Sequence, residues 1–319
     1  MSELIFEPAL DDLVASEVDV YASRNENNAK LIDRQDPIVY ASKEQPSPLD
    51  RSLIDTYNEQ GFVVLDGVFS PDEVATFQQE LECLRADSKI QKSDEVVNEP
   101  NSNDLRSIFR VHESNPLFKA LAVDERLADL ARYLLDDEVY IHQSRLNYKP
   151  GFRGKEFYWH SDFETWHVED GMPRMRALSM SITLTENFDC NGSLMLIPGS
   201  HKKYVVCVGE TPEKHYLASL KKQEHGVPSD ACLKTLAAQG GIVSAIGKPG
   251  SVIVFDCNVM HGSNGNITPF PRSNVFFVYN ALSNKVVNPF CAQAPRPEYI
   301  CSRESIHLVP RSHGEKLNA

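Results

Sequence analysis

Three segments of this chain alternate between apolar and polar side chains, and this period of two constrains the fold more than any other feature. In Leu178–Thr185, Leu, Met, Ile and Leu stand at the even positions, with Ser, Ser and Thr between them. Val139–Tyr148 and Arg272–Asn280 show the same period. Because alternate side chains of a strand point to opposite faces, we expect three β-strands that pack one face on a core.

One of these strands carries polar side chains where open solvent is not expected. In Val139–Tyr148, alternation places Gln143, Arg145 and Asn147 on one face, with the apolar Ile141 in the same row. A polar row that includes a branched apolar residue is typical of a wet cavity rather than an outer surface. We therefore expect this face to line a cavity inside the fold.

Helices precede most of the strands. Ser70, Pro71 and Glu73 form the pattern of a capping box with proline in the first turn, and Phe69 and Val74 are spaced as a hydrophobic staple. A second helix is predicted over about Leu117–Leu135, where leucines recur at helical spacing. Three further apolar runs that end at turn residues are predicted as strands: Phe62–Leu65, Leu194–Ile197 and Ser251–Phe255.

This order of elements predicts a mainly β fold with flanking α-helices, as a barrel or sandwich with an outer helical layer. Residues 1–45 are polar and acidic, so we expect a loosely ordered N-terminal arm with one short helix around Ala9–Val18. Residues 46–319 are expected to form a single domain.

Composition restricts the partners. The 319 residues include 45 acidic and 32 basic side chains, for a net charge of −13. Such a surface repels nucleic acid and anionic membranes, so we expect neither as a partner. The first residues lack the basic and apolar regions of a signal peptide, and the seven cysteines are scattered without CxxC spacing. We expect a cytoplasmic protein without a disulfide framework.

His160, Asp162 and His261 are the candidate metal ligands. In an extended segment, residues two apart project to the same side, so His160 and Asp162 can reach one ion. His261 follows the predicted strand Ser251–Phe255 and can meet them inside a barrel. Two imidazoles and one carboxylate on one face of an octahedral ion, with open positions opposite, are typical of iron(II) oxygenases.

Arg272 opens the next strand, eleven residues after His261, in a run rich in Phe and Val. An arginine that faces inward there needs an anion, and the 5-carboxylate of 2-oxoglutarate is a suitable bidentate partner. Ser263 and Asn147 are placed to add hydrogen bonds to this co-substrate. Together with the metal ligands, these residues predict an oxygenase that uses iron(II), 2-oxoglutarate and O2.

Other histidines compete as ligands, and we expect all of them to be structural. His142 is predicted on the outer face of the Gln143 strand, and His201 lies in a turn, which makes it the best reserve ligand. The remaining competitors lie in a charged loop or in a Lys-rich insert: His167, His215 and His225.

Three stretches carry a family resemblance. They are Phe157–Pro173, which contains the sequence FYWHSDFETWH, then Gly192–His201, and Pro269–Asn280. The chain resembles the ectoine hydroxylases, which belong to the phytanoyl-CoA dioxygenase-like branch of the iron(II)/2-oxoglutarate oxygenases. The resemblance covers about Leu49–Arg303.

The resemblance implies a double-stranded β-helix core of the jelly-roll or cupin-like type. It implies hydroxylation of ectoine to 5-hydroxyectoine with release of succinate and CO2, a step of compatible-solute synthesis under osmotic or heat stress. By position, iron is held by His160, Asp162 and His261, and no catalytic residue is implied beyond the metal centre. The implied co-substrate contacts are Arg272, Ser263 and Asn147. The implied substrate contacts are Gln143, Trp166, Phe255, Asn274 and Arg296.

Residue chemistry agrees with such a substrate. Ectoine combines a flat cyclic amidinium, which an aromatic face such as Trp166 can hold, with a carboxylate that suits an arginine. Trp166 stands among Glu164, His167 and Glu169, which is not the context expected of a core residue. Glu164 is open to two interpretations, as a partner of the amidinium or as a solvated carboxylate.

Two alternatives remain at this level. One is a related dioxygenase acting on another small amino-acid-like substrate or on an acyl-CoA, for which Lys202-Lys203 and Lys221-Lys222 are the candidate phosphate contacts. The other is a barrel that binds a metal or an osmolyte without turnover. The exposed arm also leaves a homodimer open.

Overall fold

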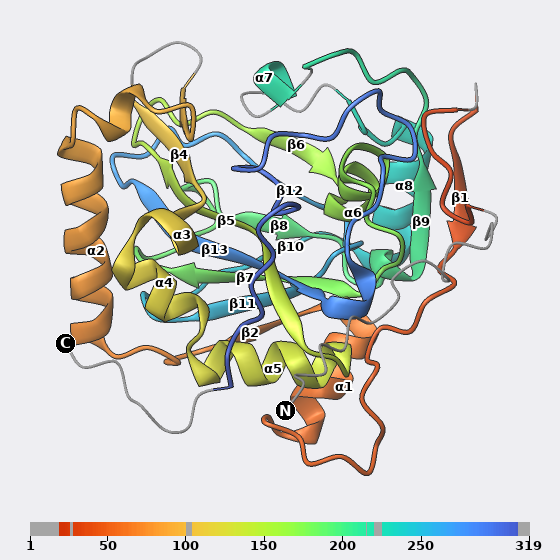
Figure 1. Ribbon diagram of the computed structural model, residues 1–319, viewed down its shortest axis with the longest axis horizontal. Coiled ribbons are helices and arrows are strands. Elements are labelled where there is room, and N and C mark those ends of the chain that lie inside the picture. The colour runs from red at the N-terminus through yellow and green to blue at the C-terminus, as the bar shows by residue number, and fades with distance from the viewer. Residues whose placement is uncertain (1–18, 26–27, 100–103, 215, 220–224, 312–319) are drawn as a thin grey trace, which may run out of the picture.

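The computed structural model in Figure 1 describes residues 19–25, 28–99, 104–214, 216–219 and 225–311. Its largest sheet is antiparallel throughout and has seven strands. Strands predicted from alternation form its centre, with bounds within two residues of those expected. In spatial order the strands are β2 (Phe62–Leu65), β11 (Val252–Asp256), β7 (Ala177–Thr183), β13 (Arg272–Ala281), β5 (Val139–Lys149), β4 (Leu105–Phe109) and β3 (Val96–Asn98).

A second antiparallel sheet faces the first. Its strands, in spatial order, are β10 (Val243–Ser244), β8 (Leu194–Leu196), β12 (His261–Ser263) and β6 (Phe157–His160). Phe255 and Phe276 from the large sheet share a buried cluster with Leu196 from this sheet. The space between the two sheets is therefore partly apolar core. Two of the candidate metal ligands, His160 and His261, lie on strands that border it, and Asp162 lies at the start of a helix that follows β6.

Helices cover the other face of the large sheet, where they appear at the left and bottom of Figure 1. Val74, Phe77, Phe118 and Leu130 belong to the same buried cluster as Leu146 of β5, so apolar contacts hold this layer in place. The helices of this layer are α1 (Arg51–Gln60), α2 (Pro71–Ala86), α3 (Val111–Ser114), α4 (Pro116–Ala122) and α5 (Glu125–Leu135).

The remaining helical elements lie near the second sheet or in connections. They are α6 (Asp162–Thr165), the π-helical turn η2 (Trp166–Asp170), α7 (Tyr216–Ser219), α8 (Asp230–Gly240) and the short 3-10 turns η1 (Ile90–Lys92), η3 (Ser200–Lys202) and η4 (Leu282–Asn284). None of the helices in the described ranges is both long and apolar enough to cross a lipid bilayer.

The start of α2 confirms the predicted capping box. Ser70 Oγ accepts a hydrogen bond from the backbone N–H of Glu73, and the Glu73 carboxylate accepts one from the N–H of Ser70. The single helix predicted over Leu117–Leu135 is wrong, because the chain forms α4 and α5 with a break at Val123-Asp124. The Asp124 side chain accepts a hydrogen bond from the N–H of Arg126, which caps a new helix at that point.

A β-bulge in β5 changes which residues face the cavity. Val278 of β13 pairs with Gln143 and Tyr279 pairs with Ile141, so His142 is the extra residue. Ile141 packs with the helix-covered core, as Leu146 does, whereas Gln143 lies on the opposite face. The prediction that Ile141 shares the row of Gln143 is therefore wrong, and so is the predicted outer position of His142.

The described part of the N-terminal segment is packed, in contrast to the loosely ordered arm that we expect from its polarity. β1 (Lys30–Asp33) pairs antiparallel with β9 (Lys203–Val206). Tyr21 and Arg24 are buried. The short helix expected around Ala9–Val18 falls outside the described residues.

Candidate active site

The pairing of β6 with β12 brings the two predicted histidine ligands together. His160 and His261 are register partners, and their ring centroids lie 4.2 Å apart. Asp162 begins α6, immediately after β6 ends. One ligand atom from each of the three residues lies within 4.8 Å of the others, and all three residues are buried. The predicted ligand set thus converges in space.

The hydrogen bonds around this cluster leave the correct atoms for a metal ion. Nδ1 of His160 donates to the carbonyl of Tyr158 and Nδ1 of His261 donates to that of Val259, so each Nε2 carries a lone pair. These Nε2 atoms lie 3.6 Å and 3.8 Å from the Asp162 carboxylate. Oδ2 of Asp162 is buried and accepts no hydrogen bond. An orphaned carboxylate oxygen beside two imidazole lone pairs fits a divalent cation.

The charge state of the cluster also suits a metal. Burial alone would raise the pKa of Asp162, but His261, His160 and Arg145 hold it well below its usual range. Burial and the neighbouring His160 lower the pKa of His261 to about 4. A carboxylate and a neutral imidazole are the forms that bind metal, so these two ligands need lose no proton near neutral pH.

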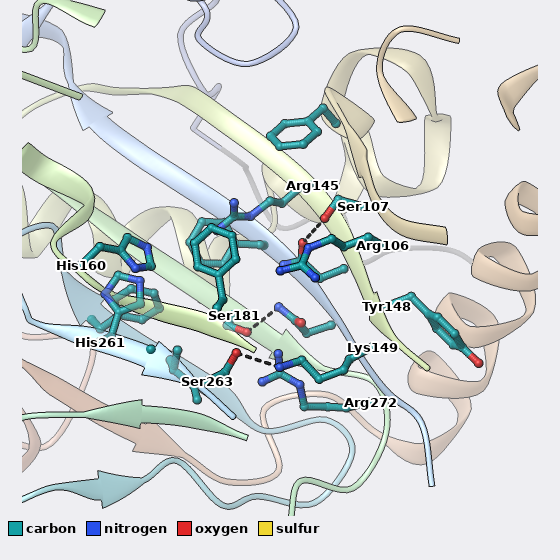
Figure 2. Close-up of a pocket in the computed structure, with 18 of the residues that line it drawn as sticks. Arg106, Ser107, Arg145, Tyr148, Lys149, His160, Ser181, His261, Ser263 and Arg272 are labelled. Atoms are coloured by element: carbon teal, nitrogen blue, oxygen red, sulfur yellow. Dashed lines mark hydrogen bonds between the residues drawn. The ribbon is translucent and has the colours of Figure 1, made fainter. Parts of the chain in front are cut away.

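A first cavity extends from the two imidazoles toward Arg272 and Lys149. Figure 2 shows the histidines at one end and these two basic side chains at the other. Arg272 and Lys149 are register partners on β13 and β5. The three residues predicted to bind the co-substrate, Arg272, Ser263 and Asn147, all line this cavity.

Several polar atoms of this cavity lack a partner within the protein. Nε of Arg272, Nε of Arg145 and Oδ1 of Asn274 are buried without a hydrogen bond. No carboxylate in the described part of the chain pairs with Arg272 or Arg145. Burial and the charge of Arg106 lower the pKa of Arg272 to about 10, so it stays a cation at neutral pH. Two half-buried guanidinium groups, each with a buried Nε that has no hydrogen-bond partner, fit a dianionic ligand.

Lys149 is a cavity residue that the sequence reasoning missed. Its Nζ donates to Ser263 Oγ at 2.8 Å and to the carbonyl of Asn264 at 2.6 Å. Burial and the nearby Arg272 lower its pKa well below the usual value. Extending the row of Gln143, Arg145 and Asn147 by two residues along β5 would have identified it.

A second cavity lies on the other side of the metal cluster. It is bordered by His160 and Asp162, and it shares Arg145 and Phe157 with the first cavity. Three predicted substrate contacts line it: Gln143, Trp166 and Arg296. Thr165, Glu169 and Tyr216 also line it, and sequence reasoning assigned no role to them in the site.

The other two predicted substrate contacts lie elsewhere. Phe255 and Asn274 line the first cavity, and they are absent from the residues around the second. Both residues lie on strands of the large sheet, Phe255 on β11 and Asn274 on β13. They line the same cavity as Arg272 and His261. The ring of Phe255 lies 5.2 Å from that of His261, and Asn274 Nδ2 donates to Ser181 Oγ. The two cavities adjoin, since Arg145, Phe157 and His160 line both, and the assignment of Phe255 and Asn274 as substrate contacts stays a prediction.

Trp166 is buried, which corrects the expectation from its charged neighbours. α6 and the π-helical turn η2 hold it 2% exposed, and Glu164, His167 and Glu169 are buried with it. Glu164 is not solvated, because Arg24 donates to both of its carboxylate oxygens. Glu169 Oε1 accepts from the same guanidinium at 2.7 Å. The π-turn, a rare form often found at functional sites, therefore rests on a buried ion-pair network.

The competing histidines lie outside the metal cluster. Nδ1 and Nε2 of His167 are engaged with Met172 O and Asp19, and His201 Nε2 donates to the carbonyl of Asn58. His225 has a partner in the structure. His215, like the pair Lys221-Lys222, lies outside the described residues. Lys202 and Lys203 line neither cavity.

Comparison with known proteins agrees with this geometry. The family model described as phytanoyl-CoA dioxygenase (PhyH) matches residues 57–274. The ectoine dioxygenase of Sphingopyxis alaskensis is 57% identical over 285 residues, which cover 89% of this chain and 93% of the relative. The ectoine dioxygenase of Stutzerimonas stutzeri is 53% identical and covers 91% of this chain and 96% of its own length.

Solved structures support the same assignment. The crystal structure of EctD from S. alaskensis with 2-oxoglutarate and 5-hydroxyectoine is similar with a TM-score of 0.82, 52% identity, and coverage of 89% of this chain and 95% of that one. A structure of the same protein with bound Fe gives a TM-score of 0.81. The carbocyclase SnoK, at 18% identity and a TM-score of 0.56, shares only the fold. These matches confirm the predicted cupin-like architecture, and the chain belongs to the phytanoyl-CoA dioxygenase family as a member of its ectoine dioxygenase branch.

Proposed function

We propose that this protein hydroxylates ectoine to 5-hydroxyectoine, using iron(II), 2-oxoglutarate and O2 and releasing succinate and CO2. The observation that carries the proposal is the position of the His160, Asp162 and His261 cluster between two cavities, each of which contains an arginine. The relatives named ectoine dioxygenase supply the identity of the substrate. The reaction balances, because one oxygen atom enters the product and the other enters succinate.

His160, Asp162 and His261 would hold the iron. When bound, iron(II) supplies the activation of O2, coupled to decarboxylation of 2-oxoglutarate. The protein holds the two imidazoles in the metal-binding tautomer through the carbonyls of Tyr158 and Val259. No side chain is required as a general acid or base.

The first cavity would bind 2-oxoglutarate. Arg272 is placed at its far end for the distal carboxylate, with Ser263 and Lys149 beside it. Asn147 forms part of the cavity wall between Arg272 and Arg145, and a hydrogen bond from Ser107 holds its side chain in place. The orphaned guanidinium Nε atoms give this cavity its preference for a dianion.

The second cavity would bind ectoine. Trp166 offers an aromatic face to the cyclic amidinium, and Glu169 adds a carboxylate near it. Arg296 and Gln143 are suited to the substrate carboxylate. Because nearly all of these side chains are buried, bound ectoine would displace water and present its ring to the metal face formed by His160 and Asp162.

The test is a reaction of the purified protein with iron(II), 2-oxoglutarate, ascorbate, O2 and ectoine, followed by mass spectrometry. One added oxygen per ectoine, matched by one succinate, is the expected result. Succinate formation that does not depend on ectoine would retain the oxygenase and overturn the substrate. Absence of succinate from protein that contains iron would favour a binding protein without turnover.

Metal ligation has its own test, independent of turnover. His160→Ala is expected to bind no stoichiometric iron, as measured by elemental analysis. His201→Ala removes a buried histidine outside the cluster and should retain iron. Equal iron content in the two variants would contradict the ligand assignment.

The net charge of −13 supports a cytoplasmic enzyme whose partners are small molecules rather than nucleic acid or membranes. The association of two copies into a homodimer is part of the same proposal, and the mass in solution tests it.

A further inference from the structure

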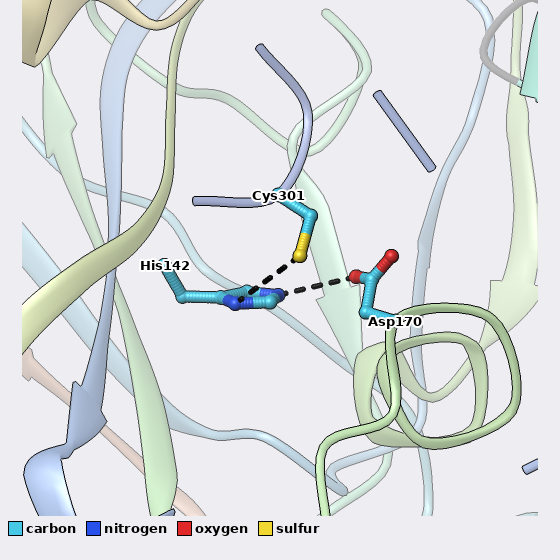
Figure 3. Close-up of side chains that lie close together, drawn as sticks. All are labelled: His142, Asp170 and Cys301. Carbon is cyan, nitrogen blue, oxygen red and sulfur yellow. Dashed lines mark hydrogen bonds and ion pairs between the residues drawn. The ribbon is translucent and has the colours of Figure 1, made fainter. Parts of the chain in front are cut away.

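Behind the wall of the second cavity lies a second buried group of His, Asp and Cys side chains. Figure 3 shows the His142 ring joined to Asp170 from one nitrogen and to Cys301 from the other. His142 comes from the bulge of β5, Asp170 ends η2, and Cys301 belongs to the segment that follows Arg296. The exposed fraction of each of the three residues is 0%.

This group has the residue types and the spacing of a metal site, but its polar atoms are already engaged with one another and with Arg296. Nε2 of His142 lies 3.2 Å from Asp170 Oδ2, and its Nδ1 lies 3.9 Å from Cys301 Sγ, so the ring uses both edges. Both carboxylate oxygens of Asp170 also accept hydrogen bonds from Arg296, at 2.8 Å and 2.5 Å. A carboxylate that already holds a guanidinium in a bidentate pair has no need of a cation.

The donor and the acceptor of each hydrogen bond in this group can be assigned. Burial raises the pKa of the Cys301 thiol, so the S–H is retained and can donate to Nδ1 of His142. His142 then donates from Nε2 to Asp170. Burial would raise the pKa of Asp170, but Arg296 and His142 hold it well below its usual range, so it is the anion that holds Arg296. The hydrogen bonds therefore converge on Asp170, which accepts from His142 on one side and from Arg296 on the other.

Of the four residues linked by these hydrogen bonds, one reaches the second cavity. Arg296 lines the cavity, whereas Asp170, His142 and Cys301 do not. The ion pair with Asp170 uses two of the five N–H groups of the Arg296 guanidinium and fixes the plane of that group. Three N–H groups are left for other acceptors. Glu169 Oε2 lies 3.7 Å from Nε of Arg296, so one further carboxylate borders the same group.

His142 supports a second wall of the cavity as well. Its ring meets Trp166 edge-to-face, with centroids 5.3 Å apart and planes at 66°. The neighbouring Gln143 lines the cavity and donates to the carbonyl of Ile300, and the N–H of Ser302 donates to the carbonyl of His142. The bulge thus lets one imidazole contact Trp166 and, through Asp170, the arginine.

We propose that Asp170 and His142 are positioning residues that hold the Arg296 guanidinium in place for the carboxylate of the substrate. This rests on the proposed function and deepens it, because it makes selection for a carboxylate-bearing cyclic amidine depend on residues that never touch the substrate. A guanidinium held in one plane binds a carboxylate without first being ordered, which gives this selection its strength.

The test compares ectoine with a cyclic amidine of the same ring that lacks the carboxylate. In the unchanged protein, kcat/KM for ectoine should exceed that for the analogue by about 100-fold or more, as for a buried charged pair. Asp170→Asn should reduce this ratio by about tenfold, while KM for 2-oxoglutarate stays within about twofold. A defect in folding alone would lower kcat/KM for both substrates by the same factor and leave the ratio unchanged.

Two further variants complete the design. His142→Phe keeps a ring against Trp166 but removes the donor to Asp170, and should reduce the ratio by about threefold. Asp256→Asn is the matched control, because Asp256 forms a buried pair with Arg34 and lines neither cavity. It should lower stability and leave the ratio intact.

The outcomes separate the two proposals. Absence of ectoine turnover by the unchanged protein would overturn the proposed function, and this inference with it. Normal turnover with a ratio that neither Asp170→Asn nor His142→Phe changes would overturn the positioning role alone. If Asp170→Asn does not fold, the ratio for His142→Phe decides between these outcomes.

Discussion

Arg24 and Glu164 form a buried ion pair, with Nη2 and Oε2 2.7 Å apart and both side chains 1% exposed. The pair joins the N-terminal segment to α6, the helix that begins with the metal-binding candidate Asp162. Nη1 of Arg24 also donates to Glu169 in the wall of the second cavity. A residue far from the site in sequence therefore neutralises two carboxylates beside it.

Arg24→Met is expected to lower the free energy of unfolding by about 3–5 kcal/mol, because it leaves Glu164 buried without its cation and removes one of the cations beside Glu169. Urea denaturation measures this. The control Arg85→Met removes a partly exposed pair with Glu82 and a contact with the Tyr148 ring, and it should cost no more than about 1 kcal/mol. The double variant Arg24→Met with Glu164→Gln should recover part of the loss. Equal losses for Arg24→Met and Arg85→Met would contradict a structural role for this pair.

Gly171 ends the π-helical turn with φ of 78°, and a Cβ there would lie 2.1 Å from the carbonyl oxygen of Val287. Since backbone cannot move aside as a side chain can, Gly171→Ala should cost about 3 kcal/mol or more. Gly67 offers the matched control, with φ of 65° and no atom within 4 Å of a built Cβ. Gly67→Ala should cost only about 1 kcal/mol from the left-handed backbone. Thermal unfolding of the two variants checks the difference, and similar losses would refute the steric explanation.

The sequence patterns predicted the central strands and the capping box, because both depend on local periodicity or on short spacing. The convergence of His160, Asp162 and His261 was predicted from a different signal, a pair of ligands two residues apart and a distant histidine just after a predicted strand. The inner row of β5 was predictable only up to the bulge. An inserted residue reverses the alternation, and nothing in the sequence around His142 indicates that a residue is inserted there. Ile141 was therefore assigned to the wrong face, and His142 was placed outside.

The burial of Trp166 and Glu164 could not be predicted for a different reason. A run of charged residues indicates solvent exposure unless partners are known, and the partner of Glu164 is Arg24, 140 residues earlier. Likewise, a position in a motif does not say which side chains a strand will meet, so the placement of Phe255 beside His261 and of Asn274 beside Ser181 was not predictable. Long-range pairing decides both cases.

Lys149→Met should weaken the binding of 2-oxoglutarate by about tenfold, because it removes a cation beside Arg272 and keeps the length of the side-chain stem. In the empty cavity, burial and Arg272 favour the neutral amine. A dianion in the cavity favours the ammonium, so binding should take up protons. Calorimetry in buffers of different ionisation enthalpy measures this uptake, which Lys149→Met should reduce. Unchanged affinity and unchanged proton uptake would place Lys149 outside the co-substrate site.

His112 gives a pH dependence that is separate from the metal site. Burial and the nearby Arg110 lower its pKa from 6.5 to about 4 in the folded protein. Between these values the unfolded chain binds the proton more readily, so the contribution of His112 to stability is complete above pH 6.5 and is lost as the pH falls toward 4. From pH 7.5 to pH 5, this loss should be about 2 kcal/mol of the free energy of unfolding of the metal-free protein. His112→Gln cannot titrate, so urea denaturation of this variant should show a smaller loss over the same interval by about that amount. An identical loss in both proteins would show that His112 titrates alike in the folded and unfolded chains.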